Sequence, residues 1–468
     1  MQLAGLAVGN RNKYGNQYGR GSLTKRLAIG GVVAGLACGL ICAQQQGKVS
    51  AKTAEAVTEW VRNEAIPLAS AAPASGLKDM EPLGAVVGDA RIVAMGEATH
   101  GTREFFQLKH RMLEYLVKQK GFTIFGIEAN WPESLVVNDY VLNGSGDPQE
   151  AVNGLHLLTA NTEELLELIR WMREYNEDPK HVQKVKFCGF DGQTAYVAVR
   201  NFLKYLEKVD PEGAKAAAKI LNPISDAEKE KTATRKPGAF WDVEEDRVQG
   251  LLKQVESKKE NYVRESSQVE WVMAQHNLEI VKQAVDLYAI KRQGNVSPRD
   301  LAMAKNVRWI LEREGSNAKI MLWAHNGHVS TGMLGGGASM GNELRQMYGN
   351  QMLVCGFSFD QGWFEAYQKG KGARPFTVGP APADTVDGVL AATGIPLFAV
   401  DLRRTPAGGA VDGWLRTPQK MRSIGAMYSE NWPDGGFSEV TPRDFDVLFF
   451  VRQTTAVRES TRTVRTAE

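Results

Sequence analysis

The sequence has few cysteines, no excess of charge of either sign, and none of several short motifs that bind common cofactors. Four cysteines in 468 residues are too few for a disulfide-stabilised scaffold. Lys and Arg (56) nearly balance Asp and Glu (54), so no net field favours nucleic acid as a partner. The chain has no phosphate-binding loop, no G-x-G-x-x-G turn between a strand and a helix, no Cys-x-x-Cys pair and no His-Glu-x-x-His helix. Nucleotide-binding, thiol-redox and zinc-protease functions are therefore not indicated.

Long hydrophobic runs are also absent, except near the N-terminus. The apolar run Leu27–Ala43 follows Lys25 and Arg26 and precedes three glutamines, which is the pattern of a secretory signal peptide. We therefore assign residues 1–50 to a signal peptide or a retained N-terminal anchor plus a linker. Export to the periplasm or the cell exterior is the expectation, with N-terminal anchoring or the cytoplasm as alternatives. No integral membrane domain is expected beyond that possible anchor.

Two cysteines, Cys38 and Cys42, lie in this N-terminal segment. The other two, Cys188 and Cys355, lie in apolar runs that are typical of buried strands. Because unpaired cysteines are commonly buried, we interpret these two as inert core thiols. The sequence alone leaves open whether they approach each other.

The most informative stretch runs from Arg91 to Thr102. Its apolar residues 92–95 predict a buried strand, which ends at Gly96, where the chain can turn sharply. Glu97 and His100 follow at once, and a helical pattern begins at Thr102, which is a suitable N-cap. In open α/β sheets ligands bind at the carboxyl ends of the strands, so this turn is the expected location of the chemistry.

Four further apolar runs also end in polar side chains. They are residues 122–128, 185–190, 319–323 and 352–357, and they lead to Glu128, Asp191, the pair His325 and His328, and Asp360. The first strand, its helix and the strand 122–128 form a βαβ unit. If the two strands of this unit are neighbours, Glu97 and Glu128 leave the sheet side by side. The repetition at one sheet edge predicts a site there.

The order of elements predicts an α/β fold with a central, mostly parallel sheet flanked by helices. Residues from 196 to about 315 are mostly helical and charged, and we interpret them as a large helical insertion. Apolar runs at 397–402 and 446–451 add two strands. The predicted domain spans residues 51–455, and residues 456–468 form a polar tail.

The segment Gly337–Gly341 matches G-x-S-x-G, the nucleophile elbow of α/β-hydrolases. That elbow needs a strand before the serine and a histidine after it, whereas here a glycine-rich loop precedes Ser339 and all seven histidines lie upstream of it. We therefore do not interpret Ser339 as a nucleophile. Four histidines lack a paired strand end and are expected to be surface or core residues: His110, His156, His181 and His276.

Several of these blocks, taken in order, resemble the erythromycin esterase family. They are Gly96–Gly101, Glu104–Met112, Phe125–Ala129, Arg299–Asn306, Trp323–His328 and Met421–Gly425. The resemblance covers roughly residues 60 to 452 and implies an α/β fold that hydrolyses a macrolide lactone with an activated water. It implies that His100 is the general base with Glu97 as its partner. It also implies that Glu128, His325 and His328 occupy the remaining essential positions.

We therefore predict a hydrolase that cleaves a carboxylic ester or a macrocyclic lactone such as erythromycin. His100 would take a proton from water, and Glu97 or Glu128 would orient its imidazole. Mutual repulsion would keep one of the two acids partly protonated, and His325 or His328 would donate to the oxyanion. The residues predicted to contact substrate are Arg103, Trp131, Asp191 and Asp360.

Two alternatives remain open at this point. One is a metal-dependent hydrolase of another small ester or lactone, with a divalent ion held by His100, His325, His328, Glu97 and Glu128. The other is a non-catalytic, exported binding protein on the same scaffold. The leading expectation is that no cofactor is needed, that the partner is a small ester or lactone, and that nucleic acid is not bound.

Overall fold

The computed structural model describes residues 50–156, 161–230, 236–289, 297–334 and 337–460. All of them belong to one unit of the chain, Val49–Glu468. The predicted signal peptide or anchor, with its apolar run Leu27–Ala43, lies outside the described residues. Within the described ranges, no helix is both long enough and apolar enough to cross a membrane.

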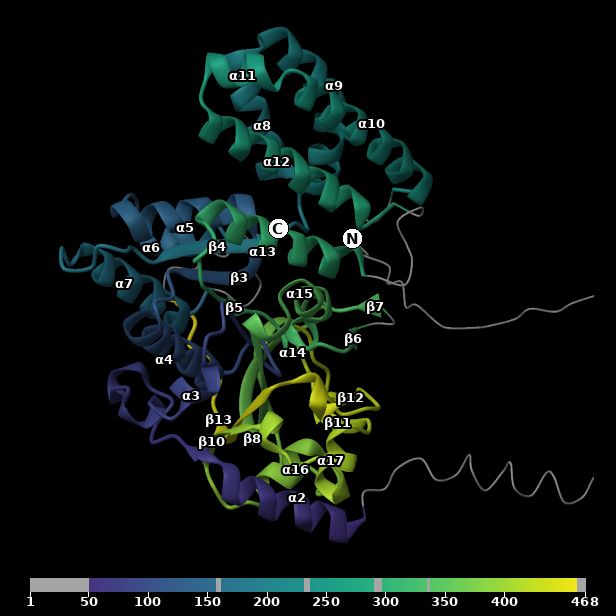
Figure 1. The fold of residues 1–468 in the computed structure, drawn as a ribbon. Helices are drawn as coiled ribbons and strands as arrows, with labels where there is room; N and C mark the ends of the chain where they lie inside the picture. Colours follow the sequence, from purple (N-terminus) through teal and green to yellow (C-terminus); the bar gives the residue numbers. More distant parts are fainter. Residues whose placement is uncertain (1–49, 157–160, 231–235, 290–296, 335–336, 461–468) are drawn as a thin grey trace, which may run out of the picture. The chain divides into compact units, whose positions relative to one another are not determined.

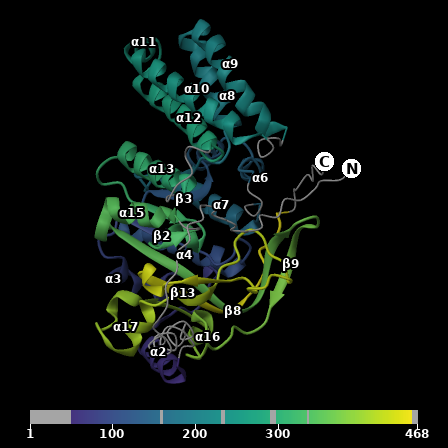
Figure 2. The same cartoon turned by 90° about the vertical axis from the view of Figure 1, so that its right-hand side faces the viewer.

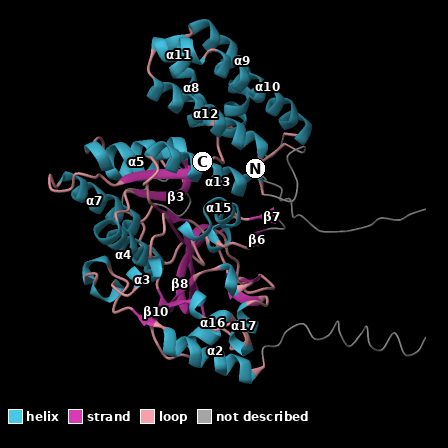
Figure 3. Ribbon diagram, in the orientation of Figure 1, coloured by secondary structure: helices cyan, strands magenta, loops and turns pink. Residues whose placement is uncertain are grey.

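A central sheet organises the described part of the chain (Figures 1 and 3). Its main path runs in the order β1 (Ile66–Pro67), β10 (Leu397–Asp401), β13 (Val447–Thr454), β8 (Met352–Gln368), β2 (Ile92–Met95), β5 (Ile320–Trp323), β3 (Ile124–Asn130) and β4 (Lys186–Asp191). The strands from β13 to β4 are parallel, whereas β10 runs antiparallel to both of its neighbours, β1 and β13. The predicted mostly parallel sheet is confirmed.

Shorter pieces complete the strands. The strand β9 (Gly372–Val378) pairs antiparallel with the long end of β8. Two small antiparallel pairs lie outside the sheet: β6 (Met333–Leu334) with β7 (Gly337–Ala338), and β11 (Gln419–Arg422) with β12 (Phe437–Val440).

Helices cover both faces of the sheet, and this explains why the sequence of β2 is apolar throughout. Ile92 and Ala94 belong to one buried cluster, and Val93 and Met95 belong to a second cluster on the other face. The first cluster includes residues of α2 (Ala51–Glu64), α13 (Pro298–Glu314), α15 (Met340–Tyr348) and α16 (Val386–Ala391). The second includes residues of α3 (Leu83–Val87), α4 (Arg103–Lys120), α6 (Pro148–Asn153) and α7 (Glu163–Glu177). A parallel strand that is buried on both faces needs an uninterrupted apolar run.

The helical insertion is present between β4 and β5. It consists of α8 (Tyr196–Val209), α9 (Pro211–Lys229), α10 (Gly238–Ser257), α11 (Lys259–Glu265) and α12 (Gln268–Asp286). These helices contact one another, α8 with α9 and α12, and α10 with α12 (Figure 2). The predicted insertion extended to about residue 315, but α13 instead contacts β4 and α15 and belongs to the layer that covers the sheet.

The βαβ unit around Gly96 forms as predicted, except for the neighbour relation of its strands. Thr102 precedes α4, but its hydroxyl bonds Thr99 instead of capping the helix. Gly121 ends α4 in the left-handed conformation, with a φ of 71°. The strand β5 lies between β2 and β3, so the expected side-by-side exit of Glu97 and Glu128 is wrong. Local sequence sets where a strand ends, but long-range pairing sets which strand lies beside it.

The C-terminal part differs from the prediction in two ways. The strand β8 continues to Gln368, so Asp360 lies within it and not at its end. The domain also extends past residue 455, because Ala456 and Glu459 form β-bridges to Thr102 and Thr162. Residues 461–468 lie outside the described residues.

The two strand cysteines lie in β4 and β8, with β2, β5 and β3 between them, and both are free. Burial raises the pKa of Cys188 to about 12 and raises the pKa of Cys355 well above its ordinary value. Because the thiolate is the reactive form, both behave as inert thiols, as predicted.

A buried carboxyl group lies beside the turn between β4 and α8, where the chain enters the helical insertion. Glu133 lies in the first turn of α5 (Trp131–Asn143) and is 4% exposed. One of its oxygens accepts hydrogen bonds from Thr194 at 3.2 Å and from Asn130 at 3.4 Å. Burial raises the pKa of Glu133 to about 7, and these hydrogen bonds only partly oppose the rise.

A second carboxyl group contacts the same turn from the insertion. Glu228, near the end of α9, accepts the backbone N–H groups of Ala195 at 2.7 Å and Tyr196 at 3.0 Å. It thereby satisfies free donors at the start of α8. Burial raises the pKa of Glu228 to about 7, and the charge of Glu133 adds to the rise.

The raised pKa values of Glu133 and Glu228 should make the stability of the folded chain depend on pH. Both bind a proton more tightly in the folded chain than at their ordinary value of 4.5. Their stabilisation is therefore complete below pH 4.5 and is lost as the pH rises through 7. We expect the free energy of unfolding, measured by urea denaturation, to fall by on the order of 2 kcal/mol between pH 5 and pH 8.

The variant Glu133→Gln should flatten this dependence, because an amide does not titrate. Glu59→Gln, at an exposed position of α2, should leave the dependence unchanged. Equal pH profiles for the parent and Glu133→Gln would contradict the assignment.

Candidate functional site

A cavity of about 470 Å³ lies where β2, β3 and β5 end. Its polar lining includes all five residues predicted for the chemistry: Glu97, His100, Glu128, His325 and His328. Phe106, Ile127, Leu165 and Trp323 add apolar surface to the lining. The structure thus brings side chains from three strand ends to one place, as expected at the carboxyl edge of a parallel sheet.

His100 and Glu97 form a hydrogen-bonded pair in the turn after β2. The Nδ1 atom of His100 bonds Oε1 of Glu97, whose side chain is 2% exposed. Because a carboxylate accepts, Nδ1 carries the proton and the lone pair is on Nε2. The turn needs Gly96, since a Cβ there would lie 2.2 Å from Oδ1 of Asn326. An imidazole oriented by a carboxylate in this way can accept a proton at Nε2.

A buried cation keeps Glu97 ionised. Lys109, on α4, has no exposed surface, and its Nζ atom donates to Oε2 of Glu97. The indole N–H of Trp323 donates to the same oxygen at 2.9 Å. Burial favours the neutral acid, but the charge of Lys109 and the hydrogen bonds from His100 and Lys109 outweigh it, so the pKa of Glu97 is below its ordinary value. Burial also lowers the pKa of Lys109, to about 8.

The sequence reasoning did not single out Lys109. The signal that was available is its place on the apolar face of the predicted helix, four residues after Phe105 and three before Met112. A lysine at such a position is buried, and a buried lysine needs a counter-charge.

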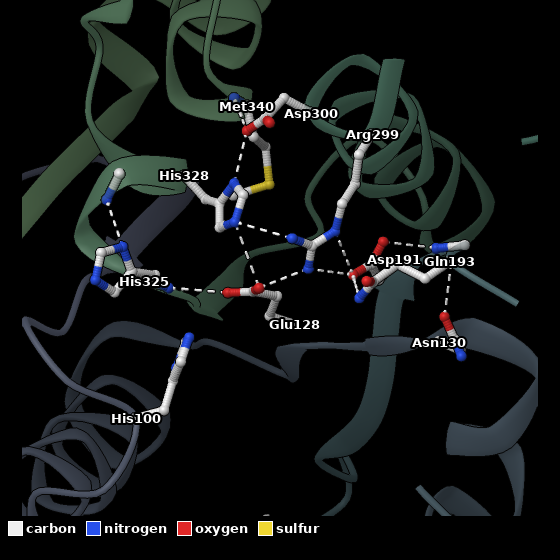
Figure 4. A network of polar contacts seen from close by, with 12 residues as sticks. His100, Glu128, Asn130, Asp191, Gln193, Arg299, Asp300, His325, His328 and Met340 are labelled. Carbon is white, nitrogen blue, oxygen red and sulfur yellow. Dashed lines mark hydrogen bonds and ion pairs between the residues drawn. The ribbon is translucent and has the colours of Figure 1, made fainter. Parts of the chain in front are cut away.

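Arg299 organises the second carboxylate. Its guanidinium lies between the carboxylates of Glu128 and Asp191 (Figure 4). Nη2 bonds Oε1 of Glu128 at 2.6 Å and Oδ2 of Asp191 at 2.7 Å. Burial would raise the pKa of Glu128, but the charges of His328 and Arg299 hold it well below its usual range. Asp191 is fully buried and does not line the cavity, so it positions Arg299 and was wrongly predicted to contact substrate.

His325 and His328, which follow β5, differ in their hydrogen bonds and in the direction of their pKa shifts. Nδ1 of His325 accepts the backbone N–H of Gly327 at 3.1 Å, so the proton is on Nε2. That Nε2 atom is buried and has no hydrogen-bond partner among the described residues. Burial and the charges of His100 and His328 lower the pKa of His325 to about 3. His325 is therefore a neutral donor with an unused N–H group.

His328 is held between two acids. Its Nδ1 atom bonds Asp300 at 2.8 Å, and its Nε2 atom lies 3.5 Å from Oε1 of Glu128. Burial opposes its charged form, but Glu128 and Asp300 outweigh burial and raise its pKa. His328 thus belongs to the charged cluster of Glu128 and Arg299, whereas His325 does not.

The expectation that mutual repulsion keeps Glu97 or Glu128 partly protonated is wrong. Each acid has its own cation, Lys109 for Glu97 and Arg299 for Glu128, and both pKa values lie below the ordinary value. Each acid also accepts a hydrogen bond from β5 or from the turn after it. The indole of Trp323 donates to Glu97, and the backbone N–H of His325 bonds Oε2 of Glu128 at 3.0 Å.

The remaining wall of the cavity comes from the C-terminal part of the chain. Gly425 and Ala426 line it, and the backbone N–H of Ile424 bonds the carbonyl of Ala98 at 2.7 Å. The backbone N–H of His100 bonds the carbonyl of Gly425 at 3.2 Å. Through these two hydrogen bonds the block Met421–Gly425 holds the turn that carries His100.

Three further residues predicted to contact substrate are not among the lining residues of the cavity, and those predictions are corrected. Arg103 lies 3.4 Å from the carboxylate of Glu164. Trp131 is 1% exposed and belongs to the cluster on the other side, against His276 and Trp309. Asp360, inside β8, accepts the backbone N–H of Ala381 at 2.9 Å. Asp360 was expected at the end of its strand, but β8 continues to Gln368, so its position does not indicate a site residue.

Ser339 is fully buried, and its hydroxyl donates to backbone carbonyls and accepts the N–H of Asn342. It caps α15 and does not line the cavity, which agrees with its exclusion as a nucleophile. Among the four remaining histidines, His110 and His276 are buried and His181 stacks on Tyr175. His156 is exposed, in agreement with its classification as a surface or core residue, and it also lines the cavity.

The five residues named for a metal site are engaged with other groups. In the part of the chain that the structure describes, no group of three His, Cys, Asp or Glu residues is arranged to hold a metal ion. The guanidinium of Arg299 lies between two carboxylates, and Nδ1 of His325 already accepts a backbone N–H. A metal held by these residues would have to displace those bonds.

Comparisons with known proteins find similarity over most of the chain. A family model described as erythromycin esterase matches residues 117–454. An Escherichia coli protein described as erythromycin esterase type II is 26% identical over 332 residues, which are 65% of this chain and 77% of that protein. A Bacillus cereus crystal structure matches with a TM-score of 0.77 and 27% identity, over 87% of this chain and 99% of that one. A mutant of the erythromycin esterase EreC, in its open conformation, shares the fold with a TM-score of 0.65 and 16% identity, over 84% and 97% of the two chains.

The buried pair of Lys109 and Glu97 predicts a large coupling in stability. Lys109→Met removes the cation and leaves a buried carboxylate without a counter-charge, which should cost about 3 kcal/mol or more in the free energy of unfolding. Adding Glu97→Gln should restore much of that loss, because the amide carries no charge. Urea denaturation of the two single variants and the double variant measures the coupling.

Additive losses in the double variant would show that the two side chains do not depend on each other. The exposed pair Lys215 and Glu212 is a matched control, and removing its lysine should change stability by less than about 1 kcal/mol.

Proposed function

The chain belongs to the erythromycin esterase family, and from that premise we propose that it hydrolyses an ester or lactone with a water molecule activated by His100. At the level of the family the protein is an ester hydrolase. The observation that carries the proposed mechanism is the free Nε2 of His100, whose ring lies 5.4 Å from the ring of His325, centroid to centroid. A base and a neutral donor thus face one cavity.

In the first step, Nε2 of His100 takes a proton from water as the water oxygen bonds the carbonyl carbon. The imidazolium that forms is stabilised by Glu97. Glu97 is ionised because the positive charge of Lys109 outweighs the effect of burial on its pKa. The carbonyl oxygen becomes negative, and the N–H of His325 donates to it. A donor of this kind typically stabilises the transition state by about 3 kcal/mol.

In the second step, the bond from the carbonyl carbon to the alkoxy oxygen breaks. The imidazolium of His100 returns its proton to the leaving oxygen, so the base is regenerated and the products are an acid and an alcohol. For a lactone both groups stay on one molecule. Glu128, Arg299 and His328 hold His325 in place through the backbone bond of Glu128 and supply a fixed local field.

The Escherichia coli relative is described as an erythromycin esterase, which makes a macrolide lactone the first candidate substrate. A simpler ester or lactone is the second candidate, supported by the moderate cavity of about 470 Å³. We further propose that the enzyme is exported, on the evidence of the apolar run Leu27–Ala43 after two basic residues. Cell fractionation distinguishes an exported enzyme from a cytoplasmic one.

We propose that the reaction needs no metal ion. The support is the tautomer of His325, whose Nδ1 is occupied by Gly327, and the position of Arg299 between the acids. A metal-dependent hydrolase would lose activity in a chelator and regain it with zinc or manganese. A non-catalytic binding protein would turn over no ester at all.

The variant His100→Ala tests the mechanism. Its kcat should fall by about 100- to 10,000-fold, because general base catalysis supplies that much. The assay follows products by mass spectrometry after incubation with erythromycin, simple lactones and aryl esters, with and without chelator. Ser339→Ala, outside the cavity, is the control and should keep its turnover.

Near-normal turnover by His100→Ala on a substrate of the parent would refute the role of His100. Loss of turnover in chelator would refute the metal-free proposal and leave the family assignment intact.

The state of Lys109 predicts an alkaline limit. Its pKa of about 8 means that the ammonium loses its proton as the pH rises through 8, and Glu97 then lacks its counter-charge. We expect kcat/KM to fall above pH 8. In Lys109→Arg the charge persists, so the pH above which kcat/KM falls should be higher. If that pH is unchanged in the variant, a group other than Lys109 causes the fall.

A further inference from the structure

Few hydrogen-bonding groups of the cavity remain available for a substrate. The charged side chains that line it are paired: Glu97 with Lys109, Glu128 with Arg299, and His328 with Asp300. The indole of Trp323 donates to Glu97, and the amide nitrogen of Gln193 donates to Asp191. The proposed chemistry uses Nε2 of His100 and Nε2 of His325.

The imidazole of His156 is the main group left over. It lines the same cavity, and neither of its ring nitrogens has a hydrogen-bond partner among the described residues. Its only ring contact there is with Tyr196, at 6.0 Å between ring centroids. An imidazole offers one donor and one acceptor, so it matches a group that can both accept and donate.

The backbone at His156 has an unusual conformation, which also indicates a ligand-binding role. His156 has a φ of 53° and is the one non-glycine residue with a positive φ in the described ranges. Leu155, just before it, is 1% exposed in the core, and it fixes the chain at the end of α6. A side chain strains the backbone in this conformation, and glycine would avoid that strain. Such strained positions concentrate at ligand sites.

We infer that His156 contacts the substrate and recognises a hydroxyl or carbonyl group that lies beside the ester being cleaved. This inference rests on the proposed function for the identity of the site. The pairing of the charged lining residues favours a neutral substrate, so discrimination comes from hydrogen bonds and not from ion pairs. The substrate class is therefore oxygenated esters and lactones, in preference to plain alkyl esters. His156 itself moves no proton in this scheme.

Matched probes test the inference. Ethyl 3-hydroxybutyrate is compared with ethyl butyrate, and ethyl lactate with ethyl propionate, because each pair differs by one hydroxyl. Binding is measured by calorimetry and ligand-detected NMR in the His100→Ala background, which should not hydrolyse the probes. Hydrolysis is measured in parallel with His100 intact, as kcat and KM.

We expect the protein to favour the hydroxylated probe of each pair by about five- to tenfold, the effect of one hydrogen bond. His156→Gly should abolish that preference, and the loss should appear as a higher KM for the hydroxylated probe of each pair. His156→Asn should keep part of it, because asparagine tolerates the left-handed backbone and retains a donor and an acceptor. The Gly variant also removes the backbone strain, so its melting temperature should not fall.

Three outcomes would overturn the inference: a preference that persists in His156→Gly, no preference in the parent, and no binding of any probe. Hydroxyl-selective binding that depends on His156, without any hydrolysis by the parent, would instead overturn the proposed function and leave this inference standing.

Discussion

The ion pair between Lys109 and Glu97 is the interaction on which the chemistry of the site depends. Both side chains lie inside the protein, where an unpaired charge of either sign is strongly disfavoured. Paired, they keep Glu97 ionised at a position where burial alone would make it neutral. An ionised Glu97 fixes the proton on Nδ1 of His100 and leaves Nε2 as the free acceptor that the proposed mechanism uses. The cation thus acts on the cavity through two hydrogen bonds without lining it.

The strand β5 separates the two acids, and each acid accepts a hydrogen bond from β5 or from the turn after it. Trp323, the last residue of β5, donates to Glu97, and the backbone of His325, two residues later, donates to Glu128. Two carboxylates on adjacent strands would repel each other and raise one pKa. With β5 between them and a separate cation for each, both are ionised, and their roles differ: Glu97 orients the base, whereas Glu128 holds the donor and Arg299.

The same compensation of charge bears on what the cavity accepts. Because its acids are matched by Lys109, Arg299 and His328, the groups left for a ligand are the imidazole edges of His100, His325 and His156. Those of His100 and His325 suit an ester carbonyl and a water molecule. That of His156 lies on strained backbone after α6, which connects substrate recognition to an element that carries no catalytic group.

Local patterns predicted the strand ends and the side chains they carry, because burial on both faces and a glycine turn are encoded by neighbouring residues. Glu97, His100, Glu128, His325 and His328 were found this way, and the family resemblance rests on the same blocks. Long-range packing sets the position of β5 between β2 and β3, the neutralisation of the two acids by Lys109 and Arg299, and the place of His156 in the cavity wall. It also decided that Trp131 and Asp360 lie elsewhere. The reason is physical: Arg299 and Glu128 are 171 residues apart, and no local pattern encodes a contact made by packing alone.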